Sequence, residues 1–165
     1  MIKAALPPFL FLSKIDLMDK QEKIQKLIKT ANDLIGVPYE YGAYLKNPSA
    51  EKPRAVDCSS FIQHIFSRIK IELPRSSILQ ATKGKEIKNP ANLSAGDLLF
   101  FESVKGHYSH KLFNGEKIYI GHVALYAGNN KIIHAAKSKK SVAKQKLSSL
   151  AKNKHFDIKL IKRII

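Results

Sequence analysis

The segment "HVALYAGNNKIIHAA", residues 122–136, is the feature that most constrains the fold of this chain. Two apolar, partly β-branched runs lie on either side of Gly128, Asn129 and Asn130. Apolar runs separated by a short turn of glycine and asparagine are typical of a β-hairpin. The sequence therefore predicts two neighbouring antiparallel strands in this segment.

Each predicted strand of the hairpin carries one histidine among apolar residues, His122 in the first strand and His134 in the second. Because side chains alternate between the two faces of a strand, the loop length decides whether the two rings share a face. A three-residue loop, residues 128–130, makes Ala124 the partner of His134 and places both rings on one face as diagonal neighbours. A loop with an even number of residues would separate them. A single histidine here is more often a hydrogen-bonded core residue, whereas a pair on one face favours a chemical role.

The only cysteine of the chain, Cys58, lies in "AVDCSSFIQHIF", residues 55–66. From Phe61 onward apolar residues recur at helical spacing until Pro74, which predicts a helix that begins at or beside Cys58. A thiol at a helix N-terminus is shifted toward the reactive thiolate, and a nearby imidazolium would shift it further. The alternative is a buried structural cysteine, but Cys58 precedes the apolar pattern and has polar neighbours.

The rest of the chain supplies further predicted elements. Residues 16–36 have the apolar spacing of an amphipathic helix that ends at glycine, and residues 36–56 form a loop rich in proline, glycine and tyrosine. The stretches at 96–102 and 155–165 have strand patterns. The polar stretch at 102–121 is longer than most connections, which makes it a candidate flap or insertion.

The chain has 165 residues and a net charge of +16, from 29 Lys and Arg against 13 Asp and Glu. Its length predicts one domain, residues 1–165, with an N-terminal extension at 1–15 and a basic C-terminal segment at 137–165 that ends in a strand. The charge favours polyanionic surroundings: nucleic acid, acidic phospholipid or an anionic wall polymer. Nucleic acid is the least favoured, because the basic segment has little aromatic interleaving. A non-catalytic cationic module that holds such a polymer is one alternative.

No metal ion or other cofactor is predicted. His107 and His110 have the spacing of metal ligands but lack a further ligand pattern. The N-terminal stretch "MIKAALPPFLFLSK" lacks the cleavage pattern of a signal peptide, and no run reaches the roughly 20 apolar residues of a membrane-spanning helix. We therefore expect a soluble chain without a transmembrane segment, and the sequence leaves its oligomeric state open.

Six short motifs occur along the chain in the order "PYEYG", "DCSSF", "LPRSSILQ", "GDLLFF", "HVALYAGN" and "IIHA". In this order they resemble the NlpC-type family of papain-like bacterial cell-wall cysteine peptidases. The resemblance implies an α+β, papain-like fold, in which N-terminal helices, with the cysteine at a helix N-terminus, pack on a central antiparallel sheet. It also implies a place in the cell envelope or outside the cell, while the lack of a clear signal peptide pattern leaves a cytoplasmic location open.

The resemblance also assigns roles to single residues. It implies that Cys58 is the nucleophile, that His122 is the general base, and that His134 orients His122. The hydroxyl of Tyr39 is implied to lie beside the sulfur and to help stabilise the oxyanion. These four residues form the expected catalytic set.

The substrate cleft is implied to be lined by Asp57, Ser59 and Ser77. The implied substrate is a peptidoglycan stem peptide, cut between D-glutamate and a diamino acid through an acyl-enzyme. Such peptides carry free carboxylates, which the basic surface, including Arg75, would attract. Anionic wall polymers are further possible partners. A papain-like amidase or acyltransferase that acts on another substrate is the second alternative.

Overall fold

The computed structural model describes residues 8–49, 52–150 and 157–165. Residues 1–7 of the expected N-terminal extension and residues 151–156 of the basic C-terminal segment lie outside these ranges. The helices and the sheet that form the site all lie within the described ranges.

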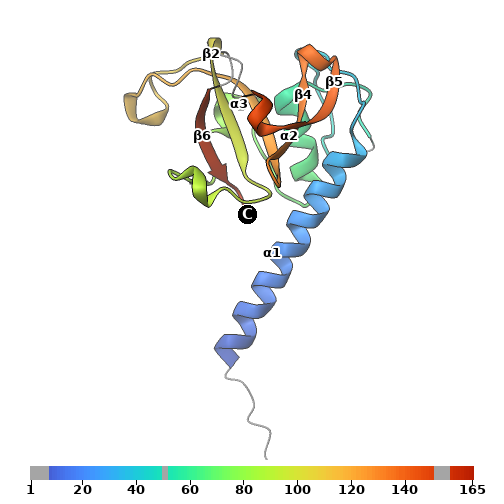
Figure 1. Cartoon of the computed structure of the whole chain (residues 1–165), viewed down its shortest axis with the longest axis vertical. Coiled ribbons are helices and arrows are strands. Elements are labelled where there is room, and N and C mark those ends of the chain that lie inside the picture. Colours follow the sequence, from blue (N-terminus) through green and yellow to red (C-terminus); the bar gives the residue numbers. More distant parts are fainter. Residues whose placement is uncertain (1–7, 50–51, 151–156) are drawn as a thin grey trace, which may run out of the picture.

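Helix α1 (Pro8–Asp33) is 26 residues long, and its C-terminal part packs on the rest of the chain. Leu27 and Ala31 are fully buried there, whereas Leu17 and Met18, more than two turns earlier in the helix, are exposed. Figure 1 shows α1 projecting from the body of the molecule. No helix in the described ranges is both long enough and apolar enough to cross a bilayer.

Helix α2 (Cys58–Ser67) begins at the cysteine, as predicted. Asp57 caps it: its Oδ1 accepts a hydrogen bond from the Ser60 amide at 2.8 Å, and the Ser60 hydroxyl accepts one from the Asp57 amide at 2.9 Å. This reciprocal capping box occupies amides that the first turn of a helix leaves without partners. The helix buries an apolar face made of Phe61, Ile62, Ile65 and Phe66. The cap and this face together fix the first residue, Cys58, at the edge of the core.

Within the described residues a six-stranded sheet has the order β1-β6-β2-β3-β4-β5, with antiparallel pairing throughout. Its strands are β1 (Lys85–Glu86), β2 (Leu98–His107), β3 (Ile120–Gly128), β4 (Lys131–Ala136), β5 (Ser141–Lys146) and β6 (Ile158–Arg163). The connections contain α3 (Ser77–Gln80), α4 (Leu147–Leu150) and the 3-10 turns η1 (Pro90–Asn92), η2 (Phe113–Gly115) and η3 (Lys137–Lys139). Helices packed on an antiparallel sheet make this an α+β fold, as the resemblance implied.

The β3–β4 hairpin has the predicted parity but not the predicted loop. Its loop contains only Asn129 and Asn130, whose φ angles of 50° and 57° suit a tight two-residue hairpin turn. Gly128 pairs with Lys131, and an irregularity between Tyr126 and Gly128 adds one residue to β3. The three-residue loop was therefore wrong. The added residue restores the parity, so the two histidines still share a face.

The alternation of side chains along β3 separates two apolar clusters. Val123 and Leu125 belong to the larger cluster, which also contains the buried face of α2. Ala124 belongs to a smaller cluster with Phe101, on the other face of the sheet. His122 has the same parity as Ala124, and its ring lies 5.7 Å from that of Phe101, centroid to centroid. The site is thus assembled at the end of the sheet, where β3 meets the start of α2.

Part of the predicted insertion at 102–121 is an excursion of strand β2. Glu102 and His107 both pair with Ile120 of β3, so the four residues between them leave the regular ladder. Residues 103–106, the β2 excursion, therefore bulge out from the sheet.

Two glycines let the β2 excursion lie close to β3. A Cβ atom added to Gly121 would collide with the side chain of Ser103. One added to Gly106 would lie 2.7 Å from the carbonyl carbon of Ile120. Because Gly121 directly precedes His122, this close approach forms a wall beside the histidine pair.

Candidate active site

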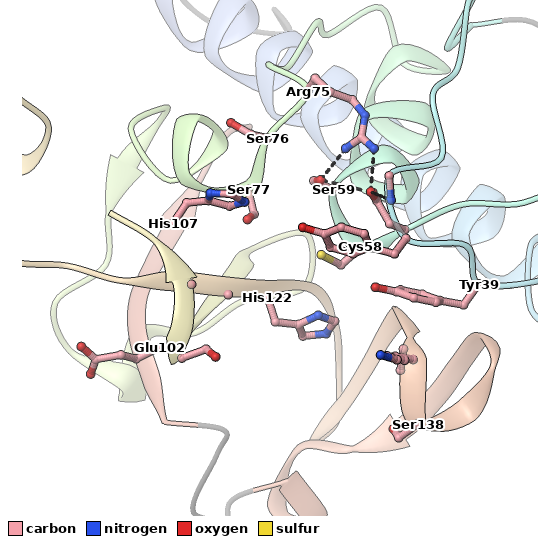
Figure 2. A pocket seen from close by; sticks show the side chains of 18 residues that line it. Tyr39, Cys58, Ser59, Arg75, Ser76, Ser77, Glu102, His107, His122 and Ser138 are labelled. Carbon is pink, nitrogen blue, oxygen red and sulfur yellow. Dashed lines mark hydrogen bonds and ion pairs between the residues drawn. The ribbon is translucent and has the colours of Figure 1, made fainter. Parts of the chain in front are cut away.

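A cavity of about 700 Å³ lies between the start of α2, the start of β3, the β2 excursion and the turn that follows β4. Cys58, His122 and Tyr39 line it from three segments that are distant in the sequence. Figure 2 shows these three side chains turned toward the same space. The fold thus brings together the residues that the motifs singled out.

Cys58 is partly exposed to the cavity. Burial raises the pKa of its thiol to about 11, and the Asp57 carboxylate adds to the rise, whereas the backbone amides of Val123 and Ser59 lower it. Desolvation and a neighbouring negative charge both disfavour a thiolate. They outweigh the expected effect of the helix N-terminus, so the thiol of the free protein is protonated at neutral pH.

The two histidines of the hairpin are hydrogen-bonded to each other. His122 Nε2 lies 2.8 Å from His134 Nδ1, and the rings meet edge to face at 73°. Burial lowers the pKa of His122 to about 3, with His134 as the second cause, and burial also lowers the pKa of His134. Both imidazoles are therefore neutral at neutral pH, and a neutral imidazole can accept a proton.

Tyr39 is held beside the cysteine by backbone contacts. It forms an isolated bridge with Val56, and its amide donates to the Lys140 carbonyl at 2.9 Å. Burial raises the pKa of its hydroxyl to about 12, and the charges of Cys58 and Asp57 contribute. The hydroxyl therefore stays protonated and can donate a hydrogen bond into the cavity, toward which it points in Figure 2.

The carboxylate of Asp57 has hydrogen-bond donors on both oxygens. Its Oδ1 accepts from the Ser60 amide and from the Ser59 hydroxyl at 3.2 Å. Its Oδ2 accepts from the Gly42 amide at 3.1 Å and from Arg75 at 2.6 Å. Burial acts to raise the pKa of Asp57, but the bonds from Arg75 and Ser60 hold the pKa below its usual value. Asp57 is therefore ionised, and it joins the cap of α2 to the cleft wall.

Arg75 ties this wall together. Besides Asp57, its guanidinium donates to the Ser59 hydroxyl at 2.8 Å and to the Ala43 carbonyl at 2.7 Å, and Figure 2 draws its bond to Ser59. Ser77, the first residue of α3, is buried and also lines the cavity. All four residues expected in the substrate cleft thus line the cavity, although three of them are bonded to one another.

Sequence reasoning missed two residues of the site. Lys137, in η3, lines the cavity, and Gln145 Oε1 on β5 lies 2.7 Å from His134 Nε2. Only the β4–β5 register brings Gln145 to the histidines, and no local pattern predicts it. Of the two further histidines considered as metal ligands, His107 lines the cavity and His110 is exposed. No group of three His, Cys, Asp or Glu in the described residues could hold a metal ion.

A family model and several known proteins match this chain. The model of the NlpC/P60 family matches residues 36–160. The chain is similar to the gamma-D-glutamyl-L-lysine dipeptidyl-peptidase of Bacillus subtilis (strain 168), with 32% identity over 118 residues, which is 72% of this chain and 34% of that protein. It is also similar to the murein DD-endopeptidase MepS/murein LD-carboxypeptidase of Escherichia coli (strain K12), with 34% identity over 107 residues, 64% of this chain and 46% of that protein.

A solved structure shares the fold. The peptidoglycan hydrolase RipB of Mycobacterium tuberculosis superposes with a TM-score of 0.65 at 24% identity, over 99% of this chain and 74% of that one. The chain spans about a third to a half of the two relatives above, and at most 59% of three others. Since the family model covers well over half of the sequence, the chain belongs to the NlpC/P60 family.

Proposed function

We propose that this protein is a cysteine peptidase that hydrolyses amide bonds in peptidoglycan stem peptides. One observation carries the proposal: Cys58 and His122 line one cavity, and a 2.8 Å hydrogen bond joins His122 to His134. A nucleophile, a base and a group that orients the base are the parts that cysteine hydrolysis requires. Membership of the NlpC/P60 family supports the same reaction.

The reaction starts from a neutral thiol and a neutral imidazole. As Cys58 Sγ attacks the amide carbon, His122 accepts the thiol proton, a carbon–sulfur bond forms, and the carbonyl electrons move to oxygen. When the tetrahedral intermediate collapses, the carbon–nitrogen bond breaks and His122 gives its proton to the leaving amine. His122 then takes a proton from water, which hydrolyses the thioester, and Cys58 regains its proton.

The oxyanion of the intermediate meets two donors. The backbone amide of Cys58 lies at the head of α2, where the first amides lack partners within the helix. The protonated hydroxyl of Tyr39 is the second donor, and its raised pKa supports this role because an ionised tyrosine could not donate. One such donor typically lowers the barrier by about 3 kcal/mol.

The bond we propose lies between D-glutamate and the following diamino acid. The Bacillus subtilis relative is a gamma-D-glutamyl-L-lysine dipeptidyl-peptidase, and its similarity to this chain supports this choice. The Escherichia coli relative, which has a comparable identity to this chain, is a murein DD-endopeptidase and LD-carboxypeptidase. The experiment below therefore identifies the bond that is cleaved.

The free carboxylates of such substrates need a cation, and Lys137 fits this role. Arg75 already donates to three protein acceptors. Lys159 is likewise engaged, because its ammonium lies 3.7 Å from the carboxylate of Glu102, which lines the cavity. Lys137 is exposed at the cavity rim, and no ion pair of Lys137 is recorded within the described ranges. Arg75 therefore acts mainly on Asp57 and Ser59, and Lys137 meets the substrate.

The proposed place of action is the cell envelope or the exterior of the cell. A net charge of +16 supports attraction to an anionic wall, because such a charge concentrates the protein near polyanions. The attraction is electrostatic, so it weakens as salt is added.

The test is digestion of purified stem peptides and of intact sacculi, followed by mass spectrometry of the fragments. We expect one new amine end at the diamino acid with the native protein and no cleavage with Cys58→Ala. Lys137→Met should raise KM for peptides with a free D-glutamate carboxylate more than for amidated ones. Lys131→Met, which changes an exposed lysine at the start of β4 outside the cavity lining, serves as the matched control.

The two alternative functions give different products. An acyltransferase would attach an added amine to the acyl fragment in place of water. A non-catalytic cationic module would bind sacculi with a steep salt dependence and leave every peptide intact, and Cys58→Ala would not alter it. Either result would overturn the proposed hydrolysis.

A further inference from the structure

Gln145 extends the pair of histidines by one further hydrogen bond. It lies on β5, where it pairs with Ile132 of β4, and His134 pairs with Ala143. Gln145 and His134 are therefore diagonal neighbours on one face of the sheet. Gln145 Oε1 lies 2.7 Å from His134 Nε2, while His134 Nδ1 lies 2.8 Å from His122 Nε2. Three side chains from three adjacent strands thus form one chain of hydrogen bonds.

The amide oxygen of Gln145 sets the donor and acceptor in both hydrogen bonds. An amide oxygen can only accept, so His134 Nε2 must carry the proton of that bond. A neutral imidazole has one N–H, which leaves His134 Nδ1 as an acceptor and makes His122 Nε2 the donor to it. The remaining ring nitrogen, His122 Nδ1, is then unprotonated and basic.

We propose that Gln145 is a positioning residue that fixes the tautomers of His134 and His122, so that His122 Nδ1 is the base for the Cys58 thiol. The inference rests on the proposed function only in the part that concerns catalysis. If the amide of Gln145 presented its NH₂ group, every bond would reverse and His122 Nδ1 would carry a proton. The ring could then no longer accept the proton of the thiol.

The groups around His122 and His134 oppose a positive charge on these rings, and the Gln145 oxygen counteracts them. Burial is the largest cause and lowers the pKa of His134. The hydrogen bond that His134 donates to Gln145 raises this pKa, and the ammonium of Lys139 in η3 lowers it. On the other side, His122 faces His134 and the Cys58 thiol across the cavity. Gln145 therefore supports the positive charge that passes to His122 during attack, against burial and against Lys139.

The tautomers can be read in the native protein by nitrogen-15 NMR of histidine-labelled full-length chain. We expect His122 and His134 to show a protonated Nε2 and an unprotonated Nδ1 at about pH 7. A protonated Nδ1 on either ring would overturn the proposal. This readout needs no substrate and no variant.

Variants then test the consequence for the cysteine. Gln145→Met removes the acceptor at similar size, Gln145→Glu keeps an acceptor and removes the NH₂ donor, and Lys146→Met changes the exposed neighbour as the matched control. Because Cys58 is the only cysteine, iodoacetamide reports on its thiol alone. We expect alkylation at about pH 7 to slow about tenfold in Gln145→Met, as for other supporting hydrogen bonds to a histidine, and to stay unchanged or rise in Gln145→Glu.

The pH dependence separates positioning from a structural role. With a cleavable stem peptide, the acidic limb of kcat/KM should move to lower pH in Gln145→Met and to higher pH in Gln145→Glu, because a carboxylate stabilises the imidazolium more than an amide does. Equal losses in both variants without a shift of the limb, or native behaviour of Gln145→Met, would overturn the role of Gln145. If the native protein shows the expected tautomers and the expected alkylation rate but cleaves no stem peptide, only the proposed function is overturned.

Discussion

At the scale of single residues, the site keeps Cys58, His122 and Tyr39 in their neutral forms. The sequence predicted these three residues from helix position, strand position and motif resemblance. It could not predict their pKa values, because burial dominates the shift of each. On Cys58, burial raises the pKa more than the helix N-terminus lowers it, so the expected thiolate does not form in the free protein.

The low pKa of His122 predicts how activity depends on pH. Burial lowers the pKa of His122 to about 3, so the unprotonated base persists far below the ordinary histidine value. The acidic limb of kcat/KM should therefore lie well below pH 6.5, as activity is lost only when His122 becomes protonated. A limb at or above pH 6.5, measured on a stem peptide, would show that the base is not this buried ring.

The oxyanion donor gives a second prediction at this scale. Tyr39→Phe removes only the hydroxyl, and kcat should fall about 100-fold, since one oxyanion donor is worth about 3 kcal/mol. The alkylation rate of Cys58 at neutral pH should not fall, because the hydroxyl is not the base. Turnover within twofold of the native rate would remove Tyr39 from the mechanism.

At the scale of elements, the hairpin shows what strand patterns can and cannot specify. The apolar runs predicted both strands, and the shared face of His122 and His134 is confirmed. The loop length was wrong, because Asn129 and Asn130 close a two-residue turn and β3 absorbs the additional residue. A bulge depends on pairing across strands, which the order of residues along one strand does not reveal.

The β2 excursion supplies the prediction at this scale. Gly121→Ala places a methyl group against the Ser103 side chain and should push the excursion away from His122. We expect kcat/KM to fall about tenfold and the melting temperature to drop by a few degrees, as for other overpacked sites.

A second change at the same contact controls this test. Ser103→Gly removes the colliding side chain, so the double variant should recover most of the loss, whereas Ser103→Gly alone measures the cost of losing the serine. Additive losses in the double variant would mean that the collision is not the cause.

At the scale of the whole molecule, the order of the motifs was enough to predict an α+β fold with helices on an antiparallel sheet. The supporting contacts were not predictable in this way. Arg75 reaches Asp57 from 18 positions away, and Gln145 reaches His134 from the next strand. Such contacts arise from the packing of distant elements, which a single sequence does not display.

Buried histidines predict how the stability of the fold depends on pH. Burial lowers the pKa values of His64, His122 and His134 in the folded state, so the unfolded chain binds more protons once the pH falls below about 6.5. Their contribution is fully present above that pH and is lost progressively toward pH 3. Urea unfolding at about pH 7, 5 and 4 should give a falling free energy of unfolding, and a constant or rising value would contradict the burial of these rings.

The central claim is that Cys58 attacks the substrate and carries its acyl group. Rapid quenching of the reaction with a stem peptide, followed by intact-protein and peptide mass spectrometry, tests it most directly. We expect a transient adduct with the mass of the acyl fragment, located on Cys58 and absent from Cys58→Ala. Cleavage of the peptide by Cys58→Ala at the native rate, without any adduct, would contradict it.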